Sequence, residues 1–277
     1  MEPLASLAVA IVCRNNADTI GRTLDSVRAL AGEIVAVDSG SEDGTLELLE
    51  GAGARVVRTG WRGHVATKQM ALELCERDWV LSVDSDESVE PDLGESIRAA
   101  LSRDEPGVAG YRVNRRVWMR GRFLEHAWQP EWRTRLVRRS LVPGSIAWGG
   151  VDPHDQLMVH SGRVERLGGV LRHDTAADFA SFLAAQVRLS RISAESMVRD
   201  GRRGSVWKLM TSPGGAFLKQ LVLKSAWRDG WRGWCAAGSA AGASLMKHVI
   251  LLDEARSRAD GGERAGGGDG SDRAGGA

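Results

Sequence analysis

The sequence predicts an α/β fold in which a mostly parallel central sheet carries helices on both faces and a helical C-terminal extension follows. Short apolar runs alternate with helix-like segments through the first hundred residues. Such alternation is typical of βαβ units, whose sheet is parallel and buried on both faces. With 277 residues and 43% apolar content, the chain can bury a core large enough for this architecture.

Each element of this alternation can be located in turn. Four short apolar runs have the length of buried strands, at residues 7–13, 33–38, 54–58 and 78–83. A helix begins near Asp18, because apolar residues follow it at helical spacing. Further helices are predicted at residues 45–50, 65–75 and 91–102, and the last opens on a proline, which suits a first helical turn.

The pattern changes after residue 105. Residues 111–148 contain short candidate strands among Gly, Pro and Trp, which predicts an antiparallel or mixed extension of the sheet. From residue 176 to about 254 the chain is predicted to be helical, with breaks at residues 201–204 and 212–215. Residues 259–277 are mostly Gly, Asp and Arg, a composition typical of a disordered tail.

The net charge of +1 conceals a division between two parts of the chain. Residues 1–105 hold 10 Lys/Arg and 20 Asp/Glu, whereas residues 106–277 hold 27 and 16. Acidic clusters suit metal cations, and basic surfaces suit phosphates, anionic lipids or nucleic acid. The three cysteines are far apart and form neither a disulfide framework nor a zinc ligand set, and no secretory signal is evident, so we expect a cytoplasmic protein.

Polar side chains follow three of the predicted strands: Arg14-Asn15-Asn16, Asp38-Ser39-Gly40-Ser41 and Asp84-Ser85-Asp86-Glu87. Ligands of open parallel sheets bind beyond the carboxyl ends of the strands. Because residues i and i+2 of a strand point the same way, Asp84 and Asp86 are predicted to approach one Mg²⁺ or Mn²⁺ that also binds diphosphate oxygens. No phosphate-cradling glycine loop follows the first strand, so the metal would have to neutralise the phosphates.

Four ordered segments resemble the nucleotide-binding half of family 2 glycosyltransferases of the GT-A fold: IVCRNNADTIGRTLDSV, EIVAVDSGSEDGT, GHVATKQMAL and DWVLSVDSDESVEPDL. The resemblance is nearest to the bacterial lipopolysaccharide-core glucosyltransferase-like group. It extends over roughly residues 5–250, through HAWQPEWRTRLVRR, WGGVDPHDQL, LGGVLRHDT and SPGGAFLKQLVLKSAWRDGWRG. It implies that Asp84 and Asp86 form the family's D-x-D motif, with Asp86 the more direct metal ligand.

The resemblance also implies a domain organisation and a nucleotide site. Residues 1–175 would be the GT-A catalytic domain, with a nucleotide-sugar-binding half at 1–105 and an acceptor-side half at 106–175. Residues 176–258 would be the helical extension and residues 259–277 the tail. Asp38 would bind the nucleobase, Arg14 and Asn15 would line the same pocket, and Lys68 would lie near the nucleotide. A helix cap or an exposed salt bridge is the structural alternative for Asp38, Arg14 and Lys68.

Inverting sugar transfer needs one carboxylate that takes the proton of the acceptor hydroxyl. The group resembled carries His-Glu after a W-x-G stretch, and this chain has His154-Asp155 after Trp148-Gly149-Gly150. The resemblance therefore implies Asp155 as the base, with His154 on the acceptor side and Asp152 as a second candidate. The Asp is one methylene shorter than the family's Glu. The structural alternative is that residues 152–155 begin a helix.

A basic segment follows the predicted nucleotide half. Residues 112–139 contain nine Arg and two Glu, interleaved with tryptophans. Such a surface suits the leaving diphosphate, a phosphorylated saccharide, a lipid headgroup or RNA, whereas a purely structural reading makes the Trp core and the Arg solvated. The resemblance places Trp128 and Arg135 on the acceptor side, so we expect a saccharide and no nucleic acid.

A second basic segment suggests a membrane surface. Residues 188–234 hold ten Lys/Arg and three acids, with apolar residues at helical spacing and three tryptophans near the end. This composition predicts attachment to anionic lipid. The longest uncharged stretch, residues 233–246, is shorter than the roughly 20 apolar residues of a span, which predicts peripheral association with the inner membrane. The alternative is a helical layer that packs on the sheet or on another subunit.

Together, the residues and the resemblance predict a metal-dependent, inverting hexosyltransferase. It would move a sugar from a nucleotide donor, expected to be a UDP-sugar, to a saccharide or lipid-linked saccharide acceptor in lipopolysaccharide-core or other cell-envelope glycan synthesis. Two other hypotheses stay open at this point. One is an aspartyl-nucleophile phosphatase, in which VLSVDSDES supplies Asp84 as the nucleophile. The other is a catalytically degenerate membrane-bound scaffold. The oligomeric state is not predicted.

Overall fold

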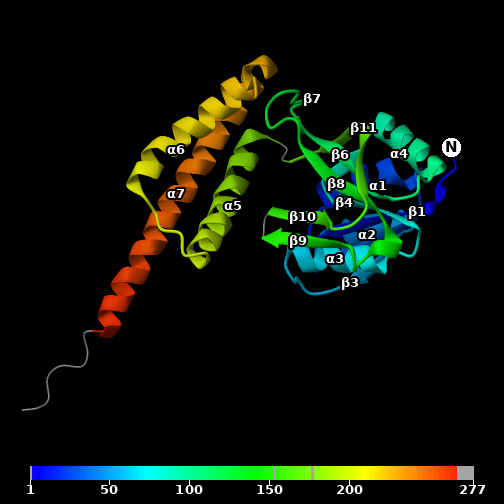
Figure 1. Ribbon diagram of the computed structural model, residues 1–277, viewed down its shortest axis with the longest axis horizontal. Coiled ribbons are helices and arrows are strands. Elements are labelled where there is room, and N and C mark those ends of the chain that lie inside the picture. Colours follow the sequence, from blue (N-terminus) through cyan, green and yellow to red (C-terminus); the bar gives the residue numbers. More distant parts are fainter. Residues whose placement is uncertain (1, 152–153, 176–177, 267–277) are drawn as a thin grey trace, which may run out of the picture. The chain divides into compact units, whose positions relative to one another are not determined.

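The computed structural model describes residues 2–151, 154–175 and 178–266 (Figure 1). The chain divides into two compact units, Met1–Phe182 and Leu183–Ala277. The predicted boundary at residue 175 falls between the last strand of the first unit and the first helix of the C-terminal segment, so the first unit also includes the start of that helix.

The first hundred residues form the predicted alternation of strands and helices. The strands are β1 (Leu4–Cys13), β2 (Ala31–Asp38), β3 (Arg55–Arg58) and β4 (Trp79–Asp84). The helices are α1 (Ala17–Arg28), α2 (Thr45–Gly51), α3 (His64–Leu74) and α4 (Pro91–Arg103). These elements lie within a few residues of their predicted bounds, because each is specified by its own apolar pattern.

Seven further strands complete the first unit: β5 (Glu87–Val89), β6 (Val108–Met119), β7 (Arg122–Phe123), β8 (Trp132–Arg138), β9 (Ile146–Val151), β10 (His154–Val159) and β11 (Arg163–His173). The large sheet has the order β3-β2-β1-β4-β8-β6-β11-β5, with β7 paired to β6, and β9 and β10 form a separate hairpin. The pairs among β1 to β4 are parallel, β8 runs antiparallel to both its neighbours, and β11 is parallel to β6. The predicted parallel sheet with a mixed extension is confirmed.

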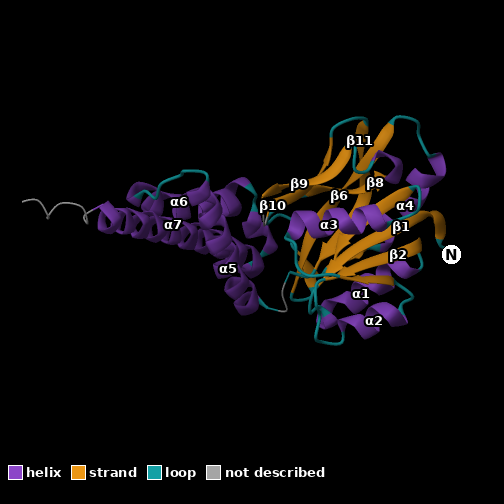
Figure 2. Cartoon of the chain, turned by 90° about the horizontal axis from the view of Figure 1, so that it is seen from below, coloured by secondary structure: helices purple, strands orange, loops and turns teal. Residues whose placement is uncertain are grey.

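Helices cover both faces of this sheet (Figure 2). One face packs on α1, α2 and α4 through apolar side chains such as Ile20, Leu49 and Ile97. The other packs on α3 and the β9–β10 hairpin, which contribute Leu72 and Trp148. Each large side chain buried in this way contributes about 1.5–3 kcal/mol to the free energy of unfolding. The fold therefore holds α3 and the hairpin on the same face of the sheet.

The C-terminal segment is helical, as predicted. It contains α5 (Phe179–Arg199), α6 (Val206–Leu218), a π-helical turn at Lys219–Leu223, a 3-10 helix at Ala226–Asp229 and α7 (Trp231–Gly266). The break predicted at residues 212–215 is wrong, because Pro213 lies inside α6. The lost hydrogen bond is tolerated there because α6 packs along α7, and tertiary packing overrides local propensity.

Helix α7 also extends further than predicted. It continues to Gly266, into the part of the chain predicted as a tail from residue 259, and residues 267–277 lie outside the described part. One stretch of it, Trp231–Glu254, has the length and apolar composition of a membrane-crossing helix, and 28% of an 18-residue apolar window within it is buried. It is longer than the predicted uncharged stretch because it includes charged residues at both ends, Arg232 at one and Lys247, Asp253 and Glu254 at the other.

Candidate active site

The carboxyl ends of β2, β1 and β4 lie side by side at one edge of the sheet. β1 is the middle strand, and its register pairs Cys13 with Asp38 and Val12 with Asp84. The strand order also reverses here, since β2 and β3 lie on one side of β1 and β4 lies on the other. Open α/β sheets bind ligands at such a reversal, in the crevice beyond the strand ends.

Asp38 ends β2 and organises the turn that follows it. Its Oδ2 accepts hydrogen bonds from the backbone N–H groups of Gly40 and Ser41, both at 3.0 Å, and its Oδ1 accepts one from the Ser41 hydroxyl. Burial opposes ionisation, but these hydrogen bonds outweigh it and hold the pKa of Asp38 below its usual value. Asp38 is 1% exposed, so in this arrangement its carboxylate braces the turn.

The residues after β1 pack against the same turn. The backbone N–H of Asn15 donates to Ser41 Oγ at 2.9 Å, and Asn15 Oδ1 accepts from the backbone N–H of Glu42 at 2.8 Å. Asn15 has a φ of 54°, a conformation that asparagine tolerates because its side chain hydrogen-bonds nearby backbone. Arg14 is exposed beside it. The structure thus brings Arg14, Asn15 and Asp38 together at one strand edge.

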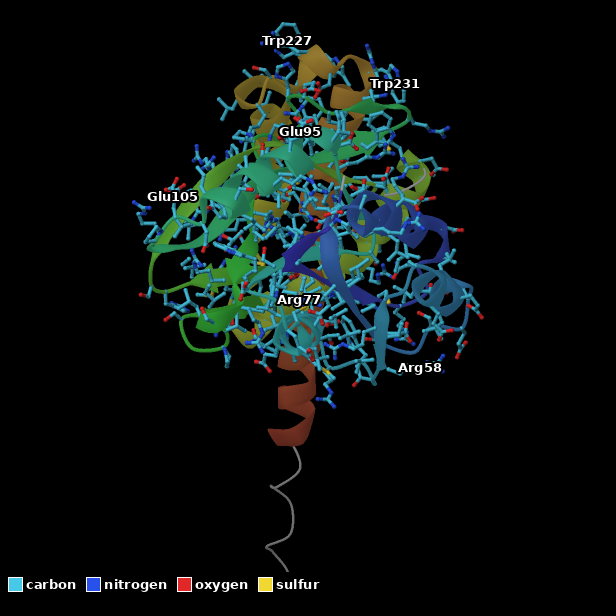
Figure 3. All side chains as sticks on the ribbon, turned by 90° about the vertical axis from the view of Figure 1, so that its right-hand side faces the viewer. Arg58, Arg77, Glu95, Glu105, Trp227 and Trp231 are labelled. Atoms are coloured by element: carbon cyan, nitrogen blue, oxygen red, sulfur yellow. The ribbon has the colours of Figure 1, made fainter. Side chains whose placement is uncertain are left out.

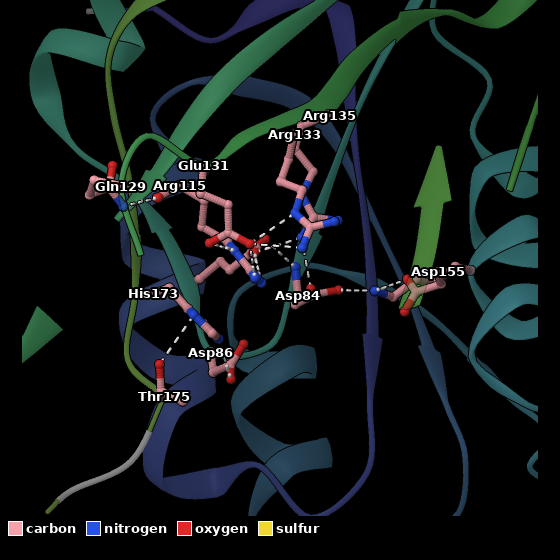
Figure 4. A network of polar contacts seen from close by, with 12 residues as sticks. Asp84, Asp86, Arg115, Gln129, Glu131, Arg133, Arg135, Asp155, His173 and Thr175 are labelled. Atoms are coloured by element: carbon pink, nitrogen blue, oxygen red, sulfur yellow. Dashed lines mark hydrogen bonds and ion pairs between the residues drawn. The ribbon is translucent and has the colours of Figure 1, made fainter. Parts of the chain in front are cut away.

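Lys68 of α3 joins two acids from distant parts of the chain. Its ammonium lies 2.6 Å from Asp84 Oδ1, at the end of β4, and 2.8 Å from Asp155 Oδ2, on β10 (Figure 4). The side chains of Lys68 and Asp155 are 7% and 11% exposed, so these pairs are shielded from the solvent that weakens surface salt bridges. Within the described part of the chain, Oδ1 of Asp155 makes no hydrogen bond.

Asp84 is held from a second direction by Arg135 of β8. Arg135 Nη2 lies 2.8 Å from Asp84 Oδ2 and 2.6 Å from Oε1 of Glu87, which is fully buried. Oε2 of Glu87 accepts the backbone N–H of Asp84 at 3.0 Å. Burial opposes ionisation of Asp84, but the Arg135 and Lys68 charges outweigh it and hold its pKa well below the usual range. Both carboxylate oxygens of Asp84 are therefore committed to ion pairs.

Asp84 and Asp86, which the sequence predicts to share one metal ion, take different partners in this structure. That prediction placed them on one face of an extended strand, but β4 ends at Asp84, and Ser85 and Asp86 form a turn into β5. The turn removes the i, i+2 alignment, and Asp86 Oδ2 lies 3.3 Å from Nε2 of His173 instead. The described residues hold no cluster of three or more His, Cys, Asp or Glu around a single metal position.

Asp86 and His173 form the pair whose donor atoms suit a divalent cation. β11 runs antiparallel to β5 with His173 opposite Glu87, which brings the imidazole beside Asp86. His173 Nδ1 lies 3.2 Å from the Thr175 hydroxyl, and this contact orients Nε2 toward Asp86 (Figure 4). Burial lowers the pKa of His173, but the Asp86 carboxylate outweighs it and raises the pKa above its usual value. A carboxylate oxygen beside an imidazole nitrogen is a donor pair that a divalent cation can bind.

A cavity of about 520 Å³ opens beside Asp84, within the size range of small-molecule sites. Asp84, Lys68, Asp155 and Trp148 line it on the side of α3 and the hairpin. The lining from β6 and β8 is mostly basic and aromatic: Arg112, Arg115, Trp132, Arg133, Thr134 and Arg135. Residues of β10 and two neighbours complete it: Gln156, Leu157, Met158, Val159, His160 and Val164. Among the described residues, the lining does not include Asp38 or Asp86.

The residues predicted on the acceptor side have different surroundings. Arg135 lines the cavity and anchors Asp84, whereas Trp128 packs against Phe182 with ring centroids 5.5 Å apart. The lining contains Trp132 in place of Trp128. Asp152 and the side chain of His154 lie outside the described residues. The helix considered for residues 152–155 is absent from the described part, since β10 begins at His154.

Sequence reasoning missed three contributors to this site. Glu87 supports Arg135 and the backbone of Asp84, and no local pattern signalled this, because Glu87 only begins the three-residue strand β5. Trp148 lies under Lys68, whose Nζ is 4.8 Å from the ring centroid. His173 was noticed within LRHDT, but its position beside Asp86 depends on the pairing of β11 with β5, which no local pattern reveals.

Comparisons with known proteins agree with this architecture. The family model described as Glycosyl transferase family 2 matches residues 8–156, from β1 to Asp155. The lipopolysaccharide core biosynthesis glycosyltransferase LpsC of Rhizobium meliloti is 28% identical over 247 residues, which cover 86% of this chain and 88% of that protein. The uncharacterized glycosyltransferase RP128 of Rickettsia prowazekii is 24% identical over 257 residues, or 90% and 88% of the two chains.

A solved structure shares the fold. S. aureus TarS 1-349, determined in complex with UDP-GlcNAc, superposes with a TM-score of 0.50 at 15% identity and covers 94% of this chain and 92% of that one. This likeness shows the GT-A fold. The family match spans more than half of the 277 residues and includes the strand-end residues and Asp155 described above. The chain therefore belongs to glycosyltransferase family 2.

Proposed function

We propose that this glycosyltransferase moves a sugar from a nucleoside diphosphate donor to a saccharide acceptor, with inversion, in lipopolysaccharide-core or related cell-envelope glycan synthesis. The observation that carries the proposal is the convergence of Lys68, Asp84 and Asp155 on one cavity at the sheet's switch point. Kinship with LpsC over most of both chains supports the envelope glycan. TarS holds UDP-GlcNAc in its structure, which makes a UDP-sugar the first donor to test.

The donor's base would bind at the turn after β2. Of the partners of Asp38, the Ser41 hydroxyl is the one that can rotate away, because the others belong to fixed backbone or to the buried Cys13. Rotation would free Oδ1 to accept an N–H from a uracil ring. Arg14 is exposed beside this turn and can approach the phosphates or the base.

Asp155 would serve as the base. Its Oδ2 is anchored by Lys68 at 2.8 Å, while Oδ1 is left to accept a hydrogen bond from an acceptor hydroxyl. As the hydroxyl oxygen attacks the anomeric carbon, Asp155 takes its proton and the bond from that carbon to the diphosphate oxygen breaks. Attack from the face opposite the leaving group inverts the anomeric configuration in one displacement.

Asp86 and His173 would hold the metal, because a carboxylate oxygen and an imidazole nitrogen lie 3.3 Å apart; Mn²⁺, which accepts both donor types, is the first ion to test. When bound there, the cation would neutralise charge on the leaving diphosphate. Asp84 was predicted to bind the metal, but we propose a different role for it. With both oxygens paired to Lys68 and Arg135, it fixes those two cations at the mouth of the donor site.

The phosphatase hypothesis does not agree with this geometry. An aspartyl nucleophile needs a free carboxylate oxygen, and both oxygens of Asp84 lie within 2.8 Å of a cation. Membership of glycosyltransferase family 2 also argues against a phosphatase. The degenerate-scaffold hypothesis predicts that no nucleoside diphosphate binds, which the experiment below tests directly.

The C-terminal unit would bind the surface of an anionic membrane, on the cytoplasmic face of the inner membrane. Trp207, Met210 and Leu223 are 75%, 74% and 79% exposed, which is costly for side chains of this size in water. Trp227 and Trp231 also lie at the surface of this unit (Figure 3). Cations accompany them along the same segments, at Lys208, Lys219, Lys224 and Arg228. Indoles and apolar side chains among cations are typical of interfacial segments.

The proposed activity is tested first by thermal unfolding in the presence of UDP, GDP and UDP-sugars, with and without Mn²⁺. A donor at about 100 times its Kd adds about 2.7 kcal/mol to the free energy of unfolding, which raises Tm by several degrees. A UDP-sugar that raises Tm more with Mn²⁺ than without supports the proposal and is then assayed for transfer to lipopolysaccharide-core oligosaccharides. If none of the nucleotides raises Tm, the proposed transferase activity is wrong and the degenerate-scaffold hypothesis replaces it.

A further inference from the structure

The arginines around the cavity fall into two groups. One group forms ion pairs with acids of the site: Arg115, Arg133 and Arg135. Arg112 lines the cavity but makes no ion pair or hydrogen bond with any described residue. Arg166, on the neighbouring strand, is not among the lining residues, but its guanidinium lies over the ring of the lining residue Trp132 at 4.8 Å. It likewise has no acidic partner among the described residues. The site therefore has positive charge that its own carboxylates leave unbalanced.

Arg112 and Arg166 are directly opposite each other in the parallel pairing of β6 with β11. Adjacent strands lie about 4.8 Å apart, and residues in register on parallel strands point to the same face. Like charges directly opposite each other in a sheet destabilise it. Both side chains are exposed, yet no described carboxylate separates them. A bound anion would relieve this repulsion.

The cavity also has aromatic walls. Trp148 and Trp132 both line it, and aromatic rings pack well on the faces of sugars. Unbalanced arginines and indole rings together match a ligand that combines a saccharide ring with negatively charged oxygens.

We propose that this part of the cavity binds the anionic group, a phosphate or a carboxylate, of an acidic saccharide acceptor. The guanidinium groups of Arg112 and Arg166 pair with its oxygens, and Trp132 packs against the ring. This inference rests on the proposed function. The donor diphosphate is a poorer match, because Asp38 and Asp86 do not belong to the described lining of this cavity. The same cavity contains Asp155, so an acceptor held this way can bring a hydroxyl to the base.

The test uses isothermal titration calorimetry of the full chain with glucose 6-phosphate, glucuronate and glucose. The variant is Arg112→Gln combined with Arg166→Gln. The matched control is Arg163→Gln, on the same strand as Arg166, because Arg163 already pairs with Glu105 and Glu165. We expect the double variant to bind the acidic sugars about tenfold or more weakly and to bind glucose as wild type does. The control should not change the affinity for any of these sugars. Tighter binding of glucose 6-phosphate than of glucuronate assigns a phosphate, and the reverse assigns a carboxylate.

Three results would overturn the inference. In the first, wild type binds glucose as tightly as both acidic sugars. In the second, wild type binds neither acidic sugar. In the third, the double variant binds the acidic sugars as tightly as wild type does. As a second readout, Arg112→Gln alone should raise the Tm of the free protein, since it removes a like-charge neighbour of Arg166. A lower Tm would contradict the repulsion on which the inference depends.

UDP titrations with Mn²⁺ on the same variants separate this inference from the proposed function. Wild type that binds acidic sugars but no nucleotide would overturn the proposed function and leave the anion site in place. Wild type that binds UDP but not the acidic sugars would overturn the anion site and leave the proposed function in place. If UDP displaces glucose 6-phosphate and the double variant loses UDP binding, the two arginines serve the donor diphosphate and the inference is overturned.

Discussion

Asp84 and Asp155 share one ammonium group, that of Lys68, at 2.6 and 2.8 Å. One acid ends a central strand of the sheet and the other lies on a hairpin that packs over the sheet's face. Two buried carboxylates this close would repel each other without the cation between them. Lys68 therefore offsets this repulsion and sets the position of the proposed base relative to the strand ends.

Replacing Lys68 with Met should destabilise the protein and abolish transfer. Asp155 would lose its ion pair, and Asp84 would keep only Arg135. Removing one partner of a buried pair costs about 3 kcal/mol or more. Chemical denaturation measures the loss, with Lys208→Met, at an exposed position, as the control. A variant as stable as wild type would show that the two ion pairs contribute nothing to the fold.

Asp155→Asn should lower the transfer rate by about 10²–10⁴-fold while donor binding stays unchanged, because the amide cannot take the acceptor's proton. Initial rates and calorimetric binding of the donor check the two effects separately. Asp25→Asn is the matched control, since Asp25 forms an exposed pair with Arg28 and neither residue is in the described cavity lining. An unaffected rate would reassign the base to another acid.

Asp86→Ala and His173→Ala should each abolish Mn²⁺-dependent sugar transfer and leave the fold intact. Because the two side chains would bind one ion, the double variant should lose no more affinity for Mn²⁺ than the worse single variant. The electron paramagnetic resonance signal of free Mn²⁺ measures this affinity, with the surface variant Glu95→Ala as control. Near-normal turnover of Asp86→Ala would refute the metal role.

The stability contributed by Asp38 should depend on pH. Its pKa is lower in the folded protein than its unfolded value of about 3.9, so its stabilisation is complete above that pH and is lost as the pH falls through the folded pKa. Asp38→Asn should therefore cost about 1–3 kcal/mol near pH 7 and progressively less toward pH 3. Urea unfolding at several pH values measures the difference. If the difference in the free energy of unfolding between wild type and the variant does not change with pH, Asp38 does not stabilise the turn as an ionised hydrogen-bond acceptor.

The full chain should sediment with vesicles that contain phosphatidylglycerol and be released in part by high salt, because salt screens the attraction between lysines and lipid. Replacing Leu223 and Trp227 together with Ser should reduce the bound fraction by removing apolar contact. Leu48→Ser, at an exposed position of the first unit, is the control. A chain that stays in solution with these vesicles at low salt would contradict the membrane proposal.

Local sequence patterns were enough to predict the α/β alternation and the edge of the sheet where the site lies. Apolar runs located β1, β2 and β4, and the polar residues after them located their carboxyl ends. This worked because burial on both faces demands continuous apolar strands, and that demand is visible in each segment separately. The order of several motifs along the chain likewise indicated family 2 before any geometry was known.

Only the tertiary structure decided which partner each acid takes. Asp155 meets Lys68 across 87 residues, and Asp84 meets Arg135 across 51. The turn after Asp84 sends Asp86 toward His173, although the D-x-D spacing predicted a shared ligand position. Ion pairs of this kind depend on which strands become neighbours, through β4 beside β8 and β5 beside β11. Short-range periodicity carries no information about those neighbours, because they form through contacts between segments that are distant in the chain.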